Sequence, residues 1–280
     1  MVDPVVSTAW LADRLRTPDI RVVDGSWHMP AEQRNGHEEY LQAHIPGAVF
    51  FDIDAIADRT SDLPHMLPSP EAFAQAAAEL GLSRAADIVI YDTHGIRSAA
   101  RVWWTLRAMG YDKVHVLDGG LRKWMSEGRP IEGGEIYPAK AQVEPRFDAE
   151  LVRSADDVRA ILSSGTARMV DARSAARFTA EAPEPRAGLR SGHMPGAANL
   201  PWEKVVSEDG TLKTAKDIKA AFKAAGVDVR KPIVTTCGSG VTASVLALAL
   251  ARLGYDRTAV YDGSWTEWAS LADTPVVTGS

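Results

Sequence analysis

The chain has 280 residues, 45% hydrophobic and 24% charged, so it is long enough for two globular domains of ordinary size. A formal net charge of −6 provides no basic surface for nucleic acid or for an anionic membrane, and neither is expected as a partner. The longest aliphatic run, residues 245–251, cannot span a bilayer and the first ten residues have no signal-peptide pattern, so we expect a cytoplasmic protein.

Short β-branched or apolar runs alternate with helical patterns along the chain. Strands are predicted at residues 20–23, 88–91, 114–117, 169–170, 233–236 and 259–261. Helices are predicted at residues 71–80, 99–109, 215–225 and 241–253, and the glycines that stop them are Gly81, Gly110, Gly226 and Gly254. This alternation predicts an α/β fold with mostly parallel sheets and helices on both faces.

The second half of the chain repeats the first. Residues 88–124 match residues 233–268, and HIPGA at 44–48 returns as HMPGA at 193–197. The segment between the halves is rich in Gly, Pro and charge, as exposed linkers are. We therefore predict an N-terminal domain at residues 1–138, a linker at 139–149 and a C-terminal domain at 150–280.

The single cysteine, Cys237, directly follows a predicted strand in the segment VTTCGSGVTAS. In parallel sheets, ligands bind beyond the carboxyl ends of the strands. Gly238 and Gly240 allow the loop to curl, so that backbone N–H groups and the start of the next helix can face one point. Such a loop stabilises the thiolate form of a cysteine, so more of the thiol should be present as the nucleophilic thiolate at neutral pH. One cysteine cannot form an internal disulfide, which fits a reducing compartment.

Other interpretations of this loop are open. A lone cysteine is often a buried structural residue. Gly238, Gly240 and Ala243 match the G-x-G-x-x-A pattern of a dinucleotide-binding domain. That pattern normally follows the first strand of its domain, whereas here an earlier strand and the His193 segment precede it, and the matching loop of the first half lacks the glycines. A cysteine phosphatase requires an arginine in the loop, and residues 237–244 contain neither Arg nor Lys.

The motifs together resemble the two-domain rhodanese family over nearly the whole chain. They are FFDID, HMLPSPEAFA, RVWW and DGG in the first half, and EPR, GHMPGA and CGSGVT in the second. The loop CGSGVT is similar to the 3-mercaptopyruvate sulfurtransferase branch. The resemblance implies that Cys237 takes sulfur from a small-molecule donor, 3-mercaptopyruvate, and releases pyruvate. A Cys237 persulfide would then pass the sulfur to cyanide or to a thiol such as thioredoxin or a small dithiol.

The resemblance also implies the residues of the site. Ser239 and His44 would form a relay with an acid, for which Glu38 and Glu39 are available although neither stands at the family's position. The donor would be bound by Arg177, Arg186, Gly238, Gly240, Val241 and Thr242. Arg190 matches less well. Without the resemblance, His44 and His193 would be read as structural histidines, and the arginines as surface residues.

The resemblance implies no cofactor, and the cysteine and scattered histidines show no metal-ligand spacing, so no metal is expected. In the first half Asp92 matches Cys237. A carboxylate cannot attack sulfur, and we expect its own loop to repel it, so that this half is catalytically silent. The neutral Gly238 and Ser239 favour 3-mercaptopyruvate over the dianion thiosulfate, which leaves thiosulfate sulfurtransferase as the alternative. A non-catalytic binding module of the same fold is a further alternative.

Overall fold

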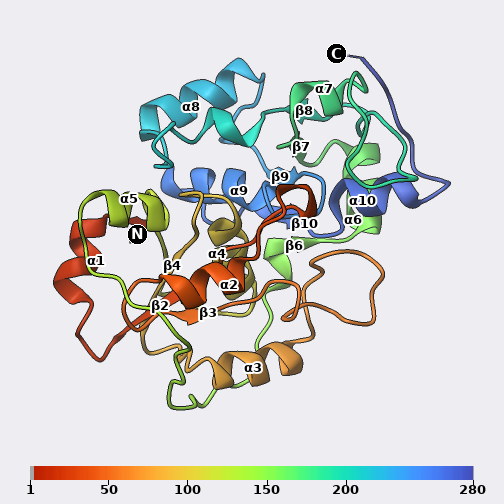
Figure 1. The fold of residues 1–280 in the computed structure, drawn as a ribbon. Coiled ribbons are helices and arrows are strands. Elements are labelled where there is room, and N and C mark those ends of the chain that lie inside the picture. The colour runs from red at the N-terminus through yellow and green to blue at the C-terminus, as the bar shows by residue number, and fades with distance from the viewer. Residues whose placement is uncertain (1–2, 280) are drawn as a thin grey trace. The chain divides into compact units, whose positions relative to one another are not determined.

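The computed structural model describes residues 3–279, which divide into two units (Figure 1). Unit 1 comprises the described residues up to 59 together with 67–148 and 207–212, and unit 2 comprises 60–66, 149–206 and the described residues from 213 onward. Each unit has one sheet of five parallel strands flanked by helices, which confirms the predicted fold class. The predicted domain boundaries differ from this division at two short segments, because residues 60–66 belong to unit 2 and residues 207–212 belong to unit 1.

The sheet of unit 1 has the strand order β1-β5-β4-β2-β3. Its strands are β1 (Val5–Val6), β2 (Ile20–Asp24), β3 (Val49–Phe50), β4 (Asp87–Tyr91) and β5 (Val114–Leu117). Its helices are α1 (Thr8–Arg14), α2 (Gly36–Gln42), α3 (Pro70–Glu79), α4 (Ser98–Ala108) and α5 (Gly120–Ser126), with a 3₁₀ turn at Pro30–Glu32.

Helices cover both faces of this sheet. On one face, Val89 of β4 belongs to a buried cluster with Leu11 of α1 and Trp124 of α5. Its neighbour Ile90 points to the opposite face, because side chains alternate along a strand. There α4 packs: a Cβ added at Gly25 would lie 2.8 Å from Val102 Cγ2 of α4 and 3.4 Å from Ile90 Cγ2.

The sheet of unit 2 repeats the order of unit 1, as β6-β10-β9-β7-β8. Its strands are β6 (Val152–Arg153), β7 (Arg168–Asp171), β8 (Ala198–Asn199), β9 (Ile233–Thr236) and β10 (Ala259–Tyr261). Its helices are α6 (Ala155–Ser164), α7 (Ala175–Phe178), α8 (Ala215–Ala224), α9 (Ala243–Arg252) and α10 (Ser264–Ser270), with 3₁₀ turns at Ala149–Leu151 and Trp202–Lys204. Residues 243–251 of α9 are all buried, as expected for a helix that is apolar on every side.

The strands and helices predicted from the sequence are confirmed, most within one residue. Helix α9 begins at Ala243, two residues later than predicted, because residues 241 and 242 complete the preceding loop. The four stop glycines have φ values of 66°, 76°, 70° and 94°, the left-handed conformation that ends helices. Residues 139–148 contain no helix or strand. Within residues 3–279, no helix has the length and apolar character needed to cross a membrane.

Asp24, at the end of β2, gives the first testable prediction. Its carboxylate is buried and accepts the N–H of Ser26 at 2.8 Å. Burial is the largest of the causes that raise the pKa of Asp24 from 3.8 to about 6. The unfolded chain therefore ionises first, and stability is lost as pH rises from about 4 through 6, by about 3 kcal/mol above that range. We expect Asp24→Asn, which keeps an acceptor, to raise the free energy of unfolding at pH 8 but not at pH 4.

Urea titrations at the two pH values would measure this difference. The matched control is Asp112→Asn, because the Asp112 side chain is 94% exposed. If Asp24→Asn and Asp112→Asn have the same free energy of unfolding at pH 8, ionisation of the buried Asp24 does not lower the stability of the folded chain.

Candidate active site

The cysteine loop, residues 237–242, lies between β9 and α9 and is held by the first turn of α10. The Cys237 side chain is buried, and its backbone N–H donates to Ser264 Oγ at 3.3 Å. In return, the Trp265 N–H donates to the Cys237 carbonyl at 2.9 Å. Thr266 donates to the Gly238 carbonyl from its N–H at 2.9 Å and from its Oγ1 at 2.6 Å. The position of the thiol is therefore fixed by bonds from a neighbouring helix.

The matching loop of unit 1 shows where the backbone N–H groups of this loop type point. Asp92 follows β4 as Cys237 follows β9, and its carboxylate accepts four backbone N–H groups at 2.8–2.9 Å. The donors are His94, Gly95, Arg97 and Ala99. The prediction that this loop repels Asp92 is wrong, because converging N–H groups attract a carboxylate.

The same arrangement is expected around Cys237. Helices α4 and α9 begin at matching positions, Ser98 and Ala243, so the two loops have the same length. The positions that match the four donors are Ser239, Gly240, Thr242 and Ser244. We therefore expect their N–H groups to face the sulfur of Cys237, where they would stabilise a negative charge.

The two glycines of the cysteine loop have different roles. Gly240 has φ 78°, a conformation that favours glycine, and Gly95 in the matching loop has φ 117°. Gly238 has no positive φ, but a Cβ added there would lie 3.1 Å from Arg177 Nη2. The guanidinium of Arg177 is therefore next to the cysteine loop, and Gly238 provides the room for it.

A chain of buried ion pairs holds Arg177 in this position. Arg173 pairs with Asp171 at 2.6 Å and with Glu184 at 2.7 Å, and Glu184 also pairs with Arg177 Nη2 at 2.5 Å. Burial opposes the charge of Arg173, yet the carboxylates of Asp171 and Glu184 raise its pKa above the usual value. The side chain of Glu184 is buried, whereas that of Arg177 remains 24% exposed. Arg177 can therefore present its free edge to an anionic ligand.

Sequence reasoning missed several members of this site. Glu184, Arg173, Ser264 and Thr266 were not singled out, although they position Arg177 and the cysteine loop. The available signals were the acidic residue two positions before Arg186 in APEPR, and the DG pair that follows the last strand in both halves.

The other predicted donor-binding residues lie in the same unit. Ser239 and Val241 are buried within the cysteine loop, Thr242 is the residue directly before α9, and Arg186 is half-buried in the segment that follows Glu184. Their contacts with a donor remain predictions. Arg190 has a structural role instead: its guanidinium donates to a set of oxygens at the end of α10, the carbonyls of Trp268, Ala269, Leu271 and Thr274.

His44 lies in the core of unit 1. Its ring is buried, its Nδ1 is 2.8 Å from the Tyr40 carbonyl, and the two rings stack at 4.3 Å. His193 of the second HxPGA motif repeats this arrangement with Phe178, at 2.9 Å and 3.6 Å. Because both histidines make the same contacts, the structural interpretation accounts for His44 without a relay.

The acids considered as partners of His44 have other contacts. Glu39 accepts hydrogen bonds from Arg34, and Glu38 accepts one from Asn35. The carboxylate near His44 is that of Glu132, with Oε1 3.5 Å from Nε2. The relay from His44 to Ser239 stays a prediction.

Comparison with known protein families agrees with the duplicated sheet and the cysteine loop. The model of the rhodanese-like domain matches residues 7–127 and 154–271, which together cover most of the chain. The chain belongs to the rhodanese family. It is 47% identical over 272 residues to the 3-mercaptopyruvate sulfurtransferase of Escherichia coli, with 97% of this chain and 96% of the relative covered.

Further rhodanese relatives include enzymes named for a different donor. The chain is 40% identical to the thiosulfate sulfurtransferase of Bos taurus over 271 residues, covering 94% of this chain and 91% of the relative. Among solved structures it matches SseA from Escherichia coli, described as a 3-mercaptopyruvate sulfotransferase, with TM-score 0.87 and 44% identity, covering 94% of this chain and 99% of that one. Rhodanese relatives at similar sequence identity are thus named for different sulfur donors.

Proposed function

We propose that this enzyme is a 3-mercaptopyruvate sulfurtransferase that works through a persulfide on Cys237. The observation that carries the proposal is the cysteine loop: a fixed thiol beyond the end of β9, beside the guanidinium of Arg177. The Escherichia coli relative named for this donor supports the substrate.

The proposed reaction begins when the Cys237 thiolate attacks the sulfur of 3-mercaptopyruvate. An S–S bond forms as the C–S bond breaks, and the electron pair of the C–S bond passes into the carbonyl to give the enolate of pyruvate. The proton lost from the Cys237 thiol balances the proton that the enolate takes up to become pyruvate. In the second half-reaction an acceptor thiolate attacks the outer sulfur, which restores the Cys237 thiol and leaves a persulfide on the acceptor.

The residues of the site fit the charges of this reaction. The cysteine loop would stabilise the thiolate and then the persulfide anion, at about 1.5–3 kcal/mol for each charge-assisted hydrogen bond. Arg177 would pair with the carboxylate of the donor, and Arg186 with its carboxylate or carbonyl. An arginine presents a planar pair of donors, which orients a carboxylate better than a lysine does.

The acceptor and the compartment follow from the same chemistry. Transfer to a thiol, on a small dithiol or on a thioredoxin-like protein, requires only a second thiolate and no metal or organic cofactor. Since Cys237 must be reduced to react, we place the enzyme in the cytoplasm. Nucleic acid has no part in the proposed function.

Thiosulfate is the competing donor, because the Bos taurus relative is named for it. Its second negative charge would favour a basic cysteine loop, and residues 238–242 carry no charged side chain. The neutral loop is therefore the observation that favours 3-mercaptopyruvate.

A comparison of the two donors tests the proposed function. We expect intact-mass measurement to show one added sulfur atom after mixing with 3-mercaptopyruvate, removable by dithiothreitol. The ratio of kcat/KM values should favour 3-mercaptopyruvate over thiosulfate by at least about tenfold, equivalent to about 1.4 kcal/mol. A ratio in favour of thiosulfate would reverse the donor assignment. An unchanged mass with both donors would instead support a binding module.

A further inference from the structure

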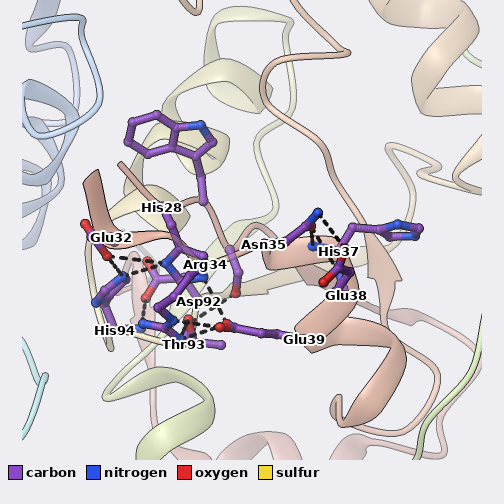
Figure 2. A network of polar contacts seen from close by, with 12 residues as sticks. His28, Glu32, Arg34, Asn35, His37, Glu38, Glu39, Asp92, Thr93 and His94 are labelled. Carbon is purple, nitrogen blue, oxygen red and sulfur yellow. Dashed lines mark hydrogen bonds and ion pairs between the residues drawn. The ribbon is translucent and has the colours of Figure 1, made fainter. Parts of the chain in front are cut away.

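We infer that unit 1 contains a binding site for a zinc-type divalent metal ion, formed by His28, Glu32 and His94. These residues offer two imidazole nitrogens and one carboxylate oxygen, all within 4.8 Å of one another. Figure 2 shows the three side chains pointing toward one another. This donor set, two histidines and one glutamate, is one that proteins use for zinc with a fourth position open.

The spacing of the three ligand atoms matches a tetrahedral ion. His28 Nδ1 is 3.0 Å from His94 Nε2 and 3.6 Å from Glu32 Oε2, and His94 Nε2 is 3.4 Å from the same oxygen. With metal–ligand bonds of about 2.0–2.1 Å, adjacent ligands of a tetrahedral zinc ion are about 3.3–3.4 Å apart. The average edge of the observed triangle falls in this range, so an ion would require only small shifts of the side chains.

The contacts around these three residues resemble the outer shell of a metal site. His28 Nε2, the nitrogen that faces away from the cluster, is 2.9 Å from Glu39 Oε2. Arg34 in turn donates to both oxygens of Glu39 at 2.6 and 2.8 Å. A carboxylate on the far nitrogen of a metal-binding histidine fixes its tautomer and increases its basicity. Nδ1 of His28 is thereby left as the ligand atom.

The net charge of the surrounding groups is also compatible with a bound cation. Three carboxylates, those of Glu32, Glu39 and Asp92, lie around the cluster with two guanidinium groups, those of Arg34 and Arg97. Arg97 binds Glu32 through Oε1 at 2.6 Å and leaves Oε2 for the ion. With neutral histidines the environment has a net charge of about −1 by this count, before an ion binds.

The three side chains of the cluster are unequally exposed to solvent. The side chain of His28 is fully buried, whereas those of His94 and Glu32 are 23% and 28% exposed. An ion could therefore enter from the exposed side, and its fourth position would face water or a small ligand. No spacing rule indicates this site, because its two histidines are 66 residues apart.

One member of the cluster, His94, lies in the loop of unit 1 that matches the cysteine loop of unit 2. Asp92 stands at the position of Cys237, and His94, two residues later, stands at the position of Ser239. The half of the chain that lacks the catalytic thiol thus has a metal-ligand residue in the same loop. The proposal does not depend on the sulfur chemistry proposed for unit 2.

Zinc titration of the untagged chain tests the proposal. Cys237→Ser serves as the common background, because a free thiol also binds zinc. We expect isothermal titration calorimetry to show one Zn²⁺ per chain, and Co²⁺ to give the visible absorption of a tetrahedral site. Glu32→Gln and His94→Ala should each weaken Zn²⁺ binding at least tenfold. Glu39→Gln, which removes the carboxylate partner of His28 and Arg34 but no ligand atom, should weaken it by about 10–100-fold.

The control variant is His37→Ala, since His37 is an exposed histidine of the same unit, paired with Glu135. It should bind Zn²⁺ as the background does. Thermal unfolding without metal identifies any variant that fails to fold, and the conservative Glu32→Gln at a partly exposed position keeps the test open if His94→Ala does so. The proposal is overturned if the background binds no Zn²⁺ in a saturable manner, or if folded Glu32→Gln binds within tenfold of it.

Discussion

Replacing Cys237 by serine should abolish pyruvate formation from 3-mercaptopyruvate and prevent any gain of sulfur mass. The hydroxyl keeps the size and position of the side chain, but its much higher pKa leaves no anion to attack sulfur at neutral pH. Because the backbone bonds to Ser264, Trp265 and Thr266 do not involve the sulfur, the loop itself should be retained.

The free energy of unfolding measured in urea gives the control for this variant, and it should change by less than about 1.5 kcal/mol for so small a change of side chain. A folded Cys237→Ser enzyme that still releases pyruvate at more than a trace rate would show that another group is the nucleophile.

Removing Arg177 should have the second largest effect. Arg177→Ala deletes the cation beside the cysteine loop, so we expect kcat/KM for 3-mercaptopyruvate to fall at least tenfold, by about 1.4 kcal/mol or more. Most of the loss should appear in KM, because in the proposed mechanism the guanidinium would pair with the donor carboxylate both before and during sulfur transfer. Arg186→Ala should lower kcat/KM in the same direction.

Two further variants separate charge from position. Arg230→Ala is the matched control, because Arg230 is an exposed arginine of the same unit that pairs with Asp228. Glu184→Gln keeps Arg177 but removes the carboxylate that holds it, so KM should rise less than in Arg177→Ala. Its stability should also fall, since Arg173 loses a buried partner. Equal kinetics for Arg177→Ala and Arg230→Ala would mean that the donor carboxylate is bound elsewhere.

The longer elements of the fold were predictable because each carries its own periodicity and stop signal. Helix α9 and strands β5, β9 and β10 are examples, since their apolar residues and flanking glycines are contiguous in the sequence. Edge strands such as β1 and β8 were not predicted. They have two residues each, too few for an alternating pattern, and they form only through pairing with a neighbouring strand.

The same distinction applies to the site. The cysteine loop was predictable because the thiol, the glycines and the helix start are neighbours in the sequence. The pairing of Glu184 with Arg177 and of His28 with His94 depends on the folded chain, and no spacing rule indicates it. The error at Asp92 came from the sign of an electrostatic interaction, since the loop that stabilises a thiolate stabilises a carboxylate as well.

Asp92 also has the shape of the proposed persulfide intermediate. Its carboxylate oxygens are two bonds beyond Cβ, as the outer sulfur of a cysteine persulfide is, whereas the sulfur of an unmodified cysteine is only one bond beyond Cβ. The four N–H groups that meet the Asp92 oxygens at 2.8–2.9 Å therefore mark, by analogy, the place of the transferred sulfur atom. In the proposed mechanism, a loop with this geometry would bind the persulfide form of Cys237 more tightly than the thiolate form, and the Asp92 loop of unit 1 would be a permanent replica of the sulfur-charged state.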